Sequence, residues 1–354
     1  MRVNSLTLKN FRNIKNLSLQ FDEGMNVICG ENAQGKTNII EALWLFSGAK
    51  SFRNSKDSSF IMFGEERAET KTEFVFAGVK NDAKIEFAEK RIAFLNEKKL
   101  ASPANLAGNF NAIVFSPSDL SLVTDGPAGR RKYLDIAIGQ LYPNYIEILK
   151  NYMRAVTQRN QIIKDYKYDS TVSVMLDVFE TEIISSGAKI IEYREKYIGI
   201  LNKHIPEIYK GLSGGREEIK SVYVTNCPAI MLEERLKEKR REDMFTGVTS
   251  VGPHRDDIEF NINGINARAY GSQGQKRSVA LTLKLSQAEV IKEITGEYPI
   301  CLLDDVMSEL DVIRQNYILN HIKNWQSFIT CCDPSNTERL KEGKIFTVSK
   351  GEVI

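Results

Sequence analysis

Hydrophobic and polar residues alternate along the first part of the chain, over residues 6–8 and 17–21. A period of two predicts two strands that are each buried on one face. The short run Asn26-Val27-Ile28-Cys29 predicts a fully buried strand. A glycine-containing loop follows this run, and residues 38–46 then predict a helix. Stretches rich in Phe, Val and Ile within residues 71–95 predict further antiparallel strands.

The pattern changes at about Asp119, where apolar residues begin to recur at helical spacing. This spacing continues through residues 131–210, and a basic helix over 232–241 ends the region. Strand-like alternation returns at residues 258–265, where Asn263-Gly264 is a strong hairpin signal. The remaining expected elements are helices over 275–294 and 311–323 and buried strands over 300–303 and 327–331.

Both ends of the chain therefore have the mixture of strands and helices that is typical of an α/β domain. The chain has 354 residues, which is too long for one compact core. We predict one α/β domain built from residues 1–118 and 245–354. A helical arm domain, residues 119–244, is inserted between these two parts.

Composition narrows the class of protein only in part. Hydrophobic residues make up 42% and charged residues 27%, which excludes a mainly disordered chain. The net charge of +2 neither predicts nor excludes binding to nucleic acid. Five cysteines without a C-x-x-C spacing argue against a zinc site and are typical of a reduced, intracellular protein. No signal peptide and no run of roughly 20 apolar residues is visible, so we expect a cytoplasmic protein without a membrane span.

A phosphate-binding motif stands between the buried strand and the first helix. It follows the pattern G-x-x-x-x-G-K-[ST] and reads Gly30-Glu31-Asn32-Ala33-Gln34-Gly35-Lys36-Thr37. The backbone N–H groups of such a loop point at phosphates. Lys36 is expected to reach the β- and γ-phosphates of ATP, and the Thr37 hydroxyl to bind Mg²⁺. The alternative, a glycine turn that only caps a helix, is weak because the motif rarely occurs by chance.

Two carboxylates follow another buried strand in Ile300-Cys301-Leu302-Leu303-Asp304-Asp305. Asp304 is placed to hold Mg²⁺ through its water shell, and Asp305 to orient or polarise the attacking water. This pattern is weak when taken alone, since strand ends often carry Asp. Together with the phosphate-binding loop it predicts an ATPase.

The segment Gly271-Ser272-Gln273-Gly274-Gln275 opens a helix between those two motifs. One interpretation is a Ser N-cap with a flexible turn. The other is a second phosphate-binding helix terminus, in which the Ser272 hydroxyl and the Gly274 amide grip a γ-phosphate. The loop at 30–37 already covers one side of the triphosphate, so this second grip would come from another subunit. Residues 308–311 would then lie at the shared face, or would simply cap a helix.

The order of these motifs resembles the ATP-binding-cassette ATPases of the SMC type, and most closely the RecF family. The resemblance covers essentially the whole chain, and its most specific segments are Gly252-Pro253-His254-Arg255-Asp256-Asp257 and Ser272-Gln273-Gly274-Gln275. It is also carried by Leu6-x-Leu8-Lys9-Asn10-Phe11-Arg12-Asn13, Val114-Phe115-Ser116-Pro117-Ser118-Asp119-Leu120, Arg130-Arg131-x-Tyr133-Leu134-Asp135 and Leu303-Asp304-Asp305-Val306-x-Ser308-Glu309-Leu310-Asp311.

The resemblance implies an SMC-like ATPase head with a short helical arm in place of a long coiled coil. It implies that two heads form a homodimer when ATP binds, with the nucleotides between them. Lys36 and Thr37 of one subunit would then face the segment Ser272-Gln273-Gly274-Gln275 of the other. Asp304 would take the Mg²⁺ role and Asp305 the water-activating role.

The resemblance further implies a role in DNA replication and repair. Such proteins bind gapped or junction-containing duplex DNA and act with RecR and RecO to load RecA at single-strand gaps. Their hydrolysis of ATP is slow and times the dissociation of the dimer. We therefore expect a DNA-dependent ATPase with slow turnover.

Three positions depart from the patterns of related ATPases. Ala33 stands where the family usually has Gly, which costs stability if its φ is positive. Thr330-Cys331-Cys332 has no His where transporter ATPases place one, and this favours slow hydrolysis. Phe115-Ser116-Pro117 stands where those enzymes carry a Gln that contacts Mg²⁺, and the sequence names no replacement.

Several basic residues have two interpretations each. Arg12 could contact nucleotide or lie at the surface, and Arg53 could contact phosphate or DNA. His254 is more typical of a structural or interface residue than of a metal ligand. The clusters at 130–132 and 235–241 could contact DNA phosphates. Acidic neighbours of the second cluster favour a solvated helix face.

Three other functions compete with the ATPase interpretation. The first is a scaffold that binds ATP without useful hydrolysis. The second is the ATPase of an overcoming-lysogenization-type nuclease system, which would need an acidic nuclease domain beyond the 50 residues that follow Asp304 (354 − 304 = 50). The third is a small-molecule kinase, which would have no use for Ser272-Gln273-Gly274-Gln275.

Overall fold

The computed structural model describes residues 1–165, 172–332 and 343–354, without the side chains of residues 172 and 173. The chain divides into two compact units. The first comprises residues 1–120, 211–215 and 280–354, and the second comprises residues 121–210 and 216–279. The predicted boundaries of the helical arm, at 119 and 244, stay a prediction, and residues 166–171 of that arm lie outside the described residues.

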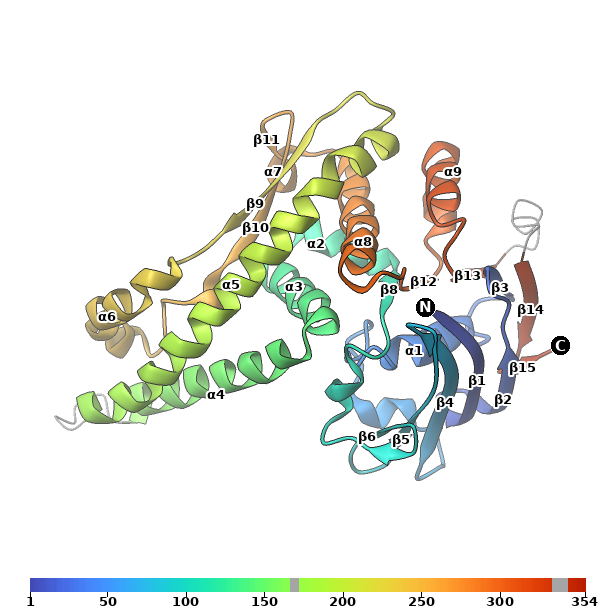
Figure 1. Cartoon of the computed structure of the whole chain (residues 1–354), viewed down its shortest axis with the longest axis horizontal. Helices are drawn as coiled ribbons and strands as arrows, with labels where there is room; N and C mark the ends of the chain where they lie inside the picture. Colours follow the sequence, from blue (N-terminus) through green and yellow to red (C-terminus); the bar gives the residue numbers. More distant parts are fainter. Residues whose placement is uncertain (166–171, 333–342) are drawn as a thin grey trace. The chain divides into compact units, whose positions relative to one another are not determined.

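A mostly parallel sheet forms the centre of the first unit (Figure 1). Its strand order is β15-β14-β3-β13-β12-β8, and only β15 runs antiparallel to its neighbour. Strands β3, β8, β12 and β13 are buried along nearly their whole length, and the sequence predicts three of them, over 26–29, 300–303 and 327–331. The strands are β3 (Met25–Cys29), β8 (Ala112–Phe115), β12 (Ile300–Leu303), β13 (Ser327–Cys331), β14 (Gly343–Ser349) and β15 (Glu352–Val353).

An antiparallel sheet forms the second layer of this unit, in the order β2-β1-β4-β5-β6-β7. Leu6 and Leu8 are buried and their neighbours Thr7 and Lys9 are exposed, so the predicted period of two is confirmed. The strands are β1 (Arg2–Phe11), β2 (Ile14–Gln20), β4 (Ala68–Phe76), β5 (Val79–Phe87), β6 (Ile92–Leu95) and β7 (Lys98–Lys99).

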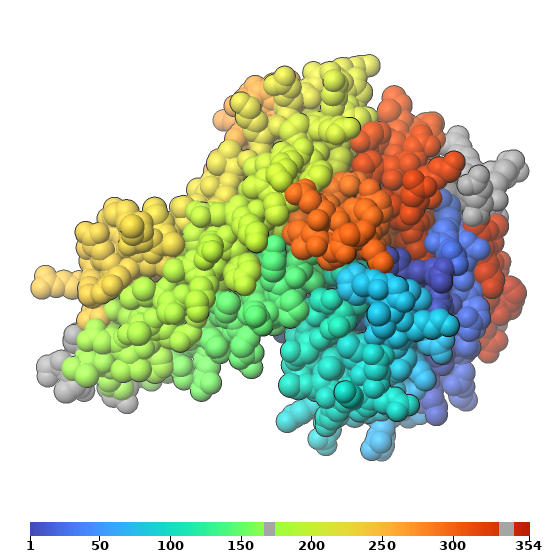
Figure 2. All heavy atoms as spheres, viewed as in Figure 1, coloured from blue at the N-terminus to red at the C-terminus, as the bar shows by residue number. Residues whose placement is uncertain are grey.

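Helix α1 (Lys36–Leu45) contacts strands of both sheets and therefore lies between the two layers. Its apolar side chains, such as Ile39 and Leu43, are fully buried there. Helix α9 (Val312–His321) and short 3-10 turns complete the described part of this unit, together with the ends of two longer helices. Figure 2 shows that the first residues of the chain and the last ones gather in this one unit.

The second unit is built from helices around a three-stranded sheet in the order β11-β10-β9. Its helices are α2 (Ser121–Thr124), α3 (Pro127–Leu141), α4 (Pro143–Asp165), α5 (Val172–Ser213), α6 (Leu232–Thr246) and α7 (Ala267–Tyr270). Helix α8 (Gln273–Thr295) begins in this unit, and α5 ends in the other one. The hairpin of β10 (Asp257–Ile262) and β11 (Ile265–Asn266) turns at Asn263-Gly264, as predicted.

The prediction of a helical segment up to residue 244 is wrong at Ile219–Val224, which form β9. This strand pairs with β10 in an antiparallel register. Ile219 and Ser221 face its buried side, whereas Val222 and Val224 are exposed. A polar residue inside and apolar residues outside hide the alternation that would have revealed the strand.

Buried ion pairs hold the elements of the second unit together. Arg159 is fully buried and donates to Glu180 and Asp243, at 3.0 and 2.7 Å. Arg194 likewise donates to Asp135 at 2.8 Å and to Asp256 at 3.2 Å. Removing one partner of such a pair costs several kcal/mol, on the order of 3–5, because a buried charge is left uncompensated.

The segment Gly252–Asp257 takes part in these contacts. The His254 ring lies 2.5 Å from the Tyr152 hydroxyl and 2.9 Å from the Thr249 carbonyl. Burial lowers the pKa of His254 below its ordinary value. These contacts agree with the structural interpretation of His254. Within the part of the chain that the structure describes, no helix has the length and apolar character to cross a membrane.

Candidate nucleotide-binding site

The phosphate-binding loop joins β3 to α1 at the carboxyl end of the parallel sheet. Gly30 has φ of 154°, and a Cβ on it would lie 2.3 Å from the carbonyl oxygen of Val348. Gly35 has φ of 113° and is the N-cap residue of α1. Ala33 also has a positive φ, 64°, so this position does carry the backbone cost that a glycine would avoid. The loop therefore has the close backbone path that phosphate-binding loops use.

Lys36 begins α1 and its side chain is turned back into the loop. Its ammonium donates to the carbonyl oxygens of Gly30 and Glu31, at 2.6 and 2.9 Å. It also contacts the Cys332 sulfur at 3.3 Å. Lys36 is only 4% exposed, so these contacts fix the positive charge beneath the loop. The sequence predicted the placement of Lys36 in the loop but not its contact with Cys332.

Thr37 and Asp304 meet at the foot of this loop. The Thr37 hydroxyl donates to an Asp304 carboxylate oxygen at 2.9 Å, although the two residues lie 267 positions apart. Burial raises the pKa of Asp304 to about 6, and the hydrogen bond from Thr37 opposes that shift only in part. A hydroxyl and a carboxylate are hard oxygen ligands, and this donor set fits Mg²⁺.

Thr330, at the end of β13, connects both carboxylates. Its hydroxyl lies 3.1 Å from Asp304 Oδ1 and 3.3 Å from Asp305 Oδ1. The same hydroxyl oxygen accepts the backbone N–H of Asp305 at 2.8 Å. Asp305 has φ of 52°, which is rare for Asp and is typical of residues held in place by their surroundings. No sequence pattern points to a role for Thr330, because only the pairing of β13 with β12 brings it to the site.

A cavity of about 520 Å³ opens beside the loop. Arg12 and Arg53 line it together with Lys36, Thr37 and Asp305. Further lining residues are Asn13, Asn32, Ala33, Gly35, Asn38, Ser59 and Ile61. Three cationic side chains and one carboxylate therefore line one polar cavity. This excess of positive charge suits a polyanionic ligand such as a nucleoside triphosphate.

Glu41 in α1 holds both arginines. It is fully buried, and its carboxylate lies 2.7 Å from Arg12 and 3.8 Å from Arg53. The Ser51 hydroxyl donates to the other oxygen at 2.5 Å. The Arg12 guanidinium also lies over the Phe60 ring, 4.8 Å from its centre. Glu41 lies four residues after Thr37, about one helical turn past the motif, and its role shows only through these contacts.

The segment Ser272–Gln275 belongs to the second unit and opens α8. The Ser272 hydroxyl oxygen accepts the Gln275 backbone N–H at 3.2 Å. The Gln275 side-chain oxygen in turn accepts the Ser272 backbone N–H at 2.7 Å. This reciprocal pair is a capping box. The N-cap interpretation is therefore seen in the structure, and Ser272 and Gln273 remain exposed.

Glu217 fixes the side chain of Gln275. The Gln275 amide donates to one Glu217 oxygen at 2.7 Å, and the Tyr209 hydroxyl donates to the other at 2.7 Å. Because Glu217 accepts from the NH₂ end, the amide oxygen is left to face Ser272. Past the two carboxylates of the other motif, Asp311 caps α9 by accepting the Arg314 backbone N–H at 2.9 Å.

The two basic clusters have partners of their own. Arg130 is 3% exposed and forms a bidentate pair of hydrogen bonds with the Asp257 carboxylate. The prediction that Arg130 contacts DNA phosphates is therefore wrong. In the second cluster, Arg235 pairs with Glu238 and Lys237 pairs with Glu233. These pairs agree with the interpretation of a solvated helix face.

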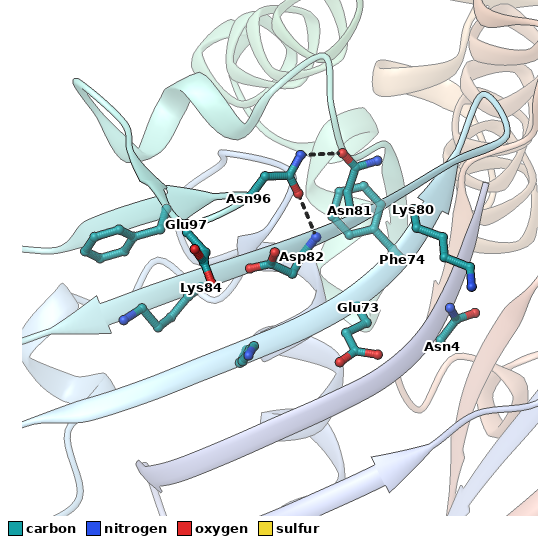
Figure 3. Close-up of a pocket in the computed structure, with 11 residues that line it drawn as sticks. Asn4, Glu73, Phe74, Lys80, Asn81, Asp82, Lys84, Asn96 and Glu97 are labelled. Carbon is teal, nitrogen blue, oxygen red and sulfur yellow. Dashed lines mark hydrogen bonds between the residues drawn. The ribbon is translucent and has the colours of Figure 1, made fainter.

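A second hollow, of about 540 Å³, lies over the antiparallel sheet (Figure 3). Lys80 and Lys84 stand among acidic side chains there, and Asn81 bonds to Asn96 at 2.9 Å. The residues that line it include none of the motif residues. Its mixed charge lacks the excess of cations that the cavity beside the loop shows, so the nucleotide site is assigned to the latter.

Comparison with known proteins agrees with this geometry. The family model described as the RecF/RecN/SMC N terminal domain matches residues 2–352. A protein of Agathobacter rectalis named DNA replication and repair protein RecF is 38% identical over 362 residues, covering 100% of this chain and 99% of that protein. The chain belongs to the RecF family of DNA replication and repair proteins. The expected α/β SMC-type head with a helical insert is thereby confirmed.

Solved structures extend the RecF comparison to three dimensions. A structure of the recombination mediator protein RecF with ATP, from the RecFOR pathway, has a TM-score of 0.92 at 36% identity and covers 100% of this chain and 97% of that one. A second RecF structure, with the ligand printed as ATPrS, has a TM-score of 0.91 at 35% identity over 99% and 97% of the two chains. The RecF family is thus an ATPase family with ATP-bound members.

Proposed function

We propose that this RecF-family protein is an ATP-gated, DNA-binding ATPase. Two copies dimerise when each binds ATP, and slow hydrolysis then releases them. The observation that carries this proposal is the 2.9 Å contact between the Thr37 hydroxyl and Asp304, beside Lys36. It joins the phosphate-binding loop to the carboxylate pair, as phosphoryl transfer requires.

The phosphate-binding loop, the two carboxylates and Arg12 have separate roles. The backbone N–H groups of residues 30–37 and the Lys36 ammonium bind the phosphates. Thr37 and Asp304 hold Mg²⁺, which neutralises charge on the β- and γ-phosphates when it is bound. Asp305 accepts a proton from, and orients, the attacking water. Arg12, held by Glu41, adds positive charge at the cavity.

The capping box supports a second phosphate contact made by the partner copy. The Ser272 oxygen is engaged as an acceptor, so its hydroxyl hydrogen is left to donate to a γ-phosphate oxygen. The Gly274 amide lies at the same helix terminus, where a negative charge is favoured. Gln273 and Gln275 complete this face. The nucleotide site of one copy is therefore completed by Ser272–Gln275 of the other.

Family membership supports the proposed partners. We infer gapped or junction-containing duplex DNA as the ligand, and RecR and RecO as protein partners in the loading of RecA. The RecF structure with ATP is described as a recombination mediator of the RecFOR pathway. Affinity for such DNA should fall steeply with salt, because phosphate contacts release counterions.

The substitution Asp305→Asn tests the proposal and separates it from a scaffold that only binds ATP. It removes the proton acceptor, so we expect the rate of ATP turnover with DNA to fall about 10²-fold or more, while ATP binding is kept. The exposed Glu66→Gln is the matched control, since it lies away from the cavity. Unchanged turnover in Asp305→Asn would favour the scaffold.

A further inference from the structure

Two cysteines stand side by side beneath the phosphate-binding loop. Cys29 is the last residue of β3 and Cys331 the last of β13, and the two are direct partners in the parallel pairing of these strands. Their sulfur atoms lie 2.7 Å apart, although the residues are separated by 302 positions. The Gly30 backbone N–H also donates to the Cys331 carbonyl oxygen, at 3.3 Å. The strand pairing therefore holds both thiols in contact.

The two thiols differ in acidity. The hydrogen bond with Cys331 lowers the pKa of Cys29; burial opposes this shift, and the positive charge of Lys36 adds to it. The same hydrogen bond raises the pKa of Cys331 above its ordinary value. The positive charge of Lys36 favours a thiolate here, and the proposal takes Cys29 as the thiol that attacks first and Cys331 as the proton donor.

The edge of the sheet at this point reaches solvent. Cys332, the next residue, is exposed, and its sulfur lies 3.3 Å from the Lys36 ammonium and 2.9 Å from the Asn32 side chain. Cys29 and Cys331 themselves retain 4% and 7% exposure. A peroxide molecule is close to water in size, so it can approach the pair from this edge. By contrast, Cys301 is fully buried inside the sheet, and burial holds its pKa well above the ordinary value.

We propose that Cys29 and Cys331 form a modification site at which a peroxide converts two thiols into an intrachain disulfide. Disulfides in intracellular proteins are mostly transient and redox-responsive, which suits a pair that a thiol reductant can reopen. The bond would join the residue before the loop to the strand that carries Thr330. The proposal uses only the thiol geometry and does not depend on the proposed ATPase function.

The chemistry balances with hydrogen peroxide as the oxidant. The Cys29 thiolate attacks one peroxide oxygen, the O–O bond breaks, and Cys29 becomes a sulfenic acid while hydroxide leaves. That hydroxide takes up the proton that Cys29 had released and becomes water. The Cys331 sulfur then attacks the Cys29 sulfur, so the S–S bond forms and the S–O bond breaks. The leaving hydroxyl takes the Cys331 proton as a second water. Two thiols are oxidised and one peroxide is reduced.

The test is a map of the disulfides in the full-length protein. Reduced protein is treated with hydrogen peroxide, alkylated, digested without reductant and analysed by mass spectrometry. We expect a linked pair of peptides that contain Cys29 and Cys331, lighter than the separate peptides by two hydrogen atoms. Dithiothreitol should return both to the alkylated form. Recovery of both cysteines as alkylated thiols, or a link from Cys331 to Cys332 instead, would overturn the proposal.

Single cysteine-to-serine variants show which thiols form the link. Cys29→Ser and Cys331→Ser should each abolish the linked peptides, whereas Cys301→Ser should leave their yield unchanged. Cys332→Ser should also leave the link in place, because Cys332 is not a member of the pair. Loss of the link in Cys332→Ser would show that the exposed thiol, and not Cys29, reacts with the peroxide, and this result would contradict the proposed order of steps.

Discussion

The Thr37 hydroxyl donates a hydrogen bond of 2.9 Å to the Asp304 carboxylate. This contact joins the N-terminal and C-terminal parts of the first unit. Asp304 is only 6% exposed. The hydrogen bond from Thr37 replaces only some of the hydrogen bonds that water would donate to an exposed carboxylate. The pKa of Asp304 is therefore raised to about 6, with burial as the main cause. The carboxylate at the proposed Mg²⁺ position thus titrates within an accessible range of pH.

Mg²⁺ binding should depend on pH through Asp304. The carboxylate must lose its proton to bind a cation, so affinity falls as the pH drops below about 6. We expect the Mg²⁺ affinity of the ATP complex, measured by titration calorimetry, to be about tenfold weaker at pH 5 than at pH 7. Asp304→Asn should remove this part of the dependence and leave only the part that the titration of the ATP γ-phosphate contributes. An equal dependence in that variant would assign the titration to another group.

The same shift affects stability without Mg²⁺. The folded state binds the Asp304 proton more tightly than the unfolded state, because the folded pKa is raised from 3.8 to about 6. This contribution is fully present below pH 3.8 and is lost as the pH rises through about 6. The free energy of unfolding of Asp304→Asn should lack that fall with rising pH.

Glu41→Ala should destabilise the protein. The buried carboxylate neutralises Arg12 at 2.7 Å, and its removal leaves that guanidinium largely buried without a counter-charge. The expected loss is about 3–5 kcal/mol in the free energy of unfolding, measured by urea denaturation. Exposed Glu66→Ala is the control and should change that free energy by no more than about 0.5 kcal/mol. A loss as small as the control's would show that the ion pair contributes little.

Glu217→Ala should weaken ATP-dependent dimerisation. Glu217 orients the Gln275 amide, and the amide completes the capping box with Ser272. Loss of a helix cap costs about 1 kcal/mol, so we expect the protein concentration at half-maximal turnover to rise several-fold. ATP affinity of the dilute monomer should stay unchanged, because this segment does not line the loop cavity.

A conservative variant and a neighbour serve as controls for that prediction. Glu217→Gln keeps an acceptor oxygen for the Gln275 amide and should recover most of the effect. Glu218→Ala alters an exposed neighbour and should behave as the parent protein. Weaker ATP binding by the dilute Glu217→Ala monomer would indicate general misfolding and contradict a positioning role for Glu217.

Local patterns in the sequence predicted the elements that carry the site. The strands predicted over 26–29 and 300–303 are β3 and β12, and the helix predicted over 38–46 is α1, which begins two residues earlier at Lys36. These features depend on neighbours in sequence, so periodicity and motif spacing suffice to find them. The sequence of Ser272–Gln275 fits both a helix cap and a phosphate contact. The structure shows the cap, and the phosphate contact stays a prediction.

The features that sequence reasoning missed depend on contacts between distant segments. Thr330 reaches both carboxylates only because β13 pairs with β12, and Cys29 meets Cys331 only because β13 also pairs with β3. Glu41 is not itself a motif residue and shows its role only through its contact with Arg12. The positive φ of Asp305 is a conformation that Asp adopts more often than most residues, but the residue type alone does not predict it. The order of β12, β13 and β3, which one sequence does not state, creates the relationships of Thr330 and of the two cysteines.

We expect ATP to bring two copies together through the phosphate-binding loop of one and Ser272 of the other. Light scattering of the parent protein, Lys36→Ala and Ser272→Arg, each with and without ATP, tests it most directly. We predict that ATP raises the mass of the parent from 40.1 kDa to about twice that value. Lys36→Ala should fail to bind ATP and stay monomeric, and Ser272→Arg should bind ATP yet stay monomeric. An ATP-induced dimer of Ser272→Arg with the parent's affinity would contradict the account.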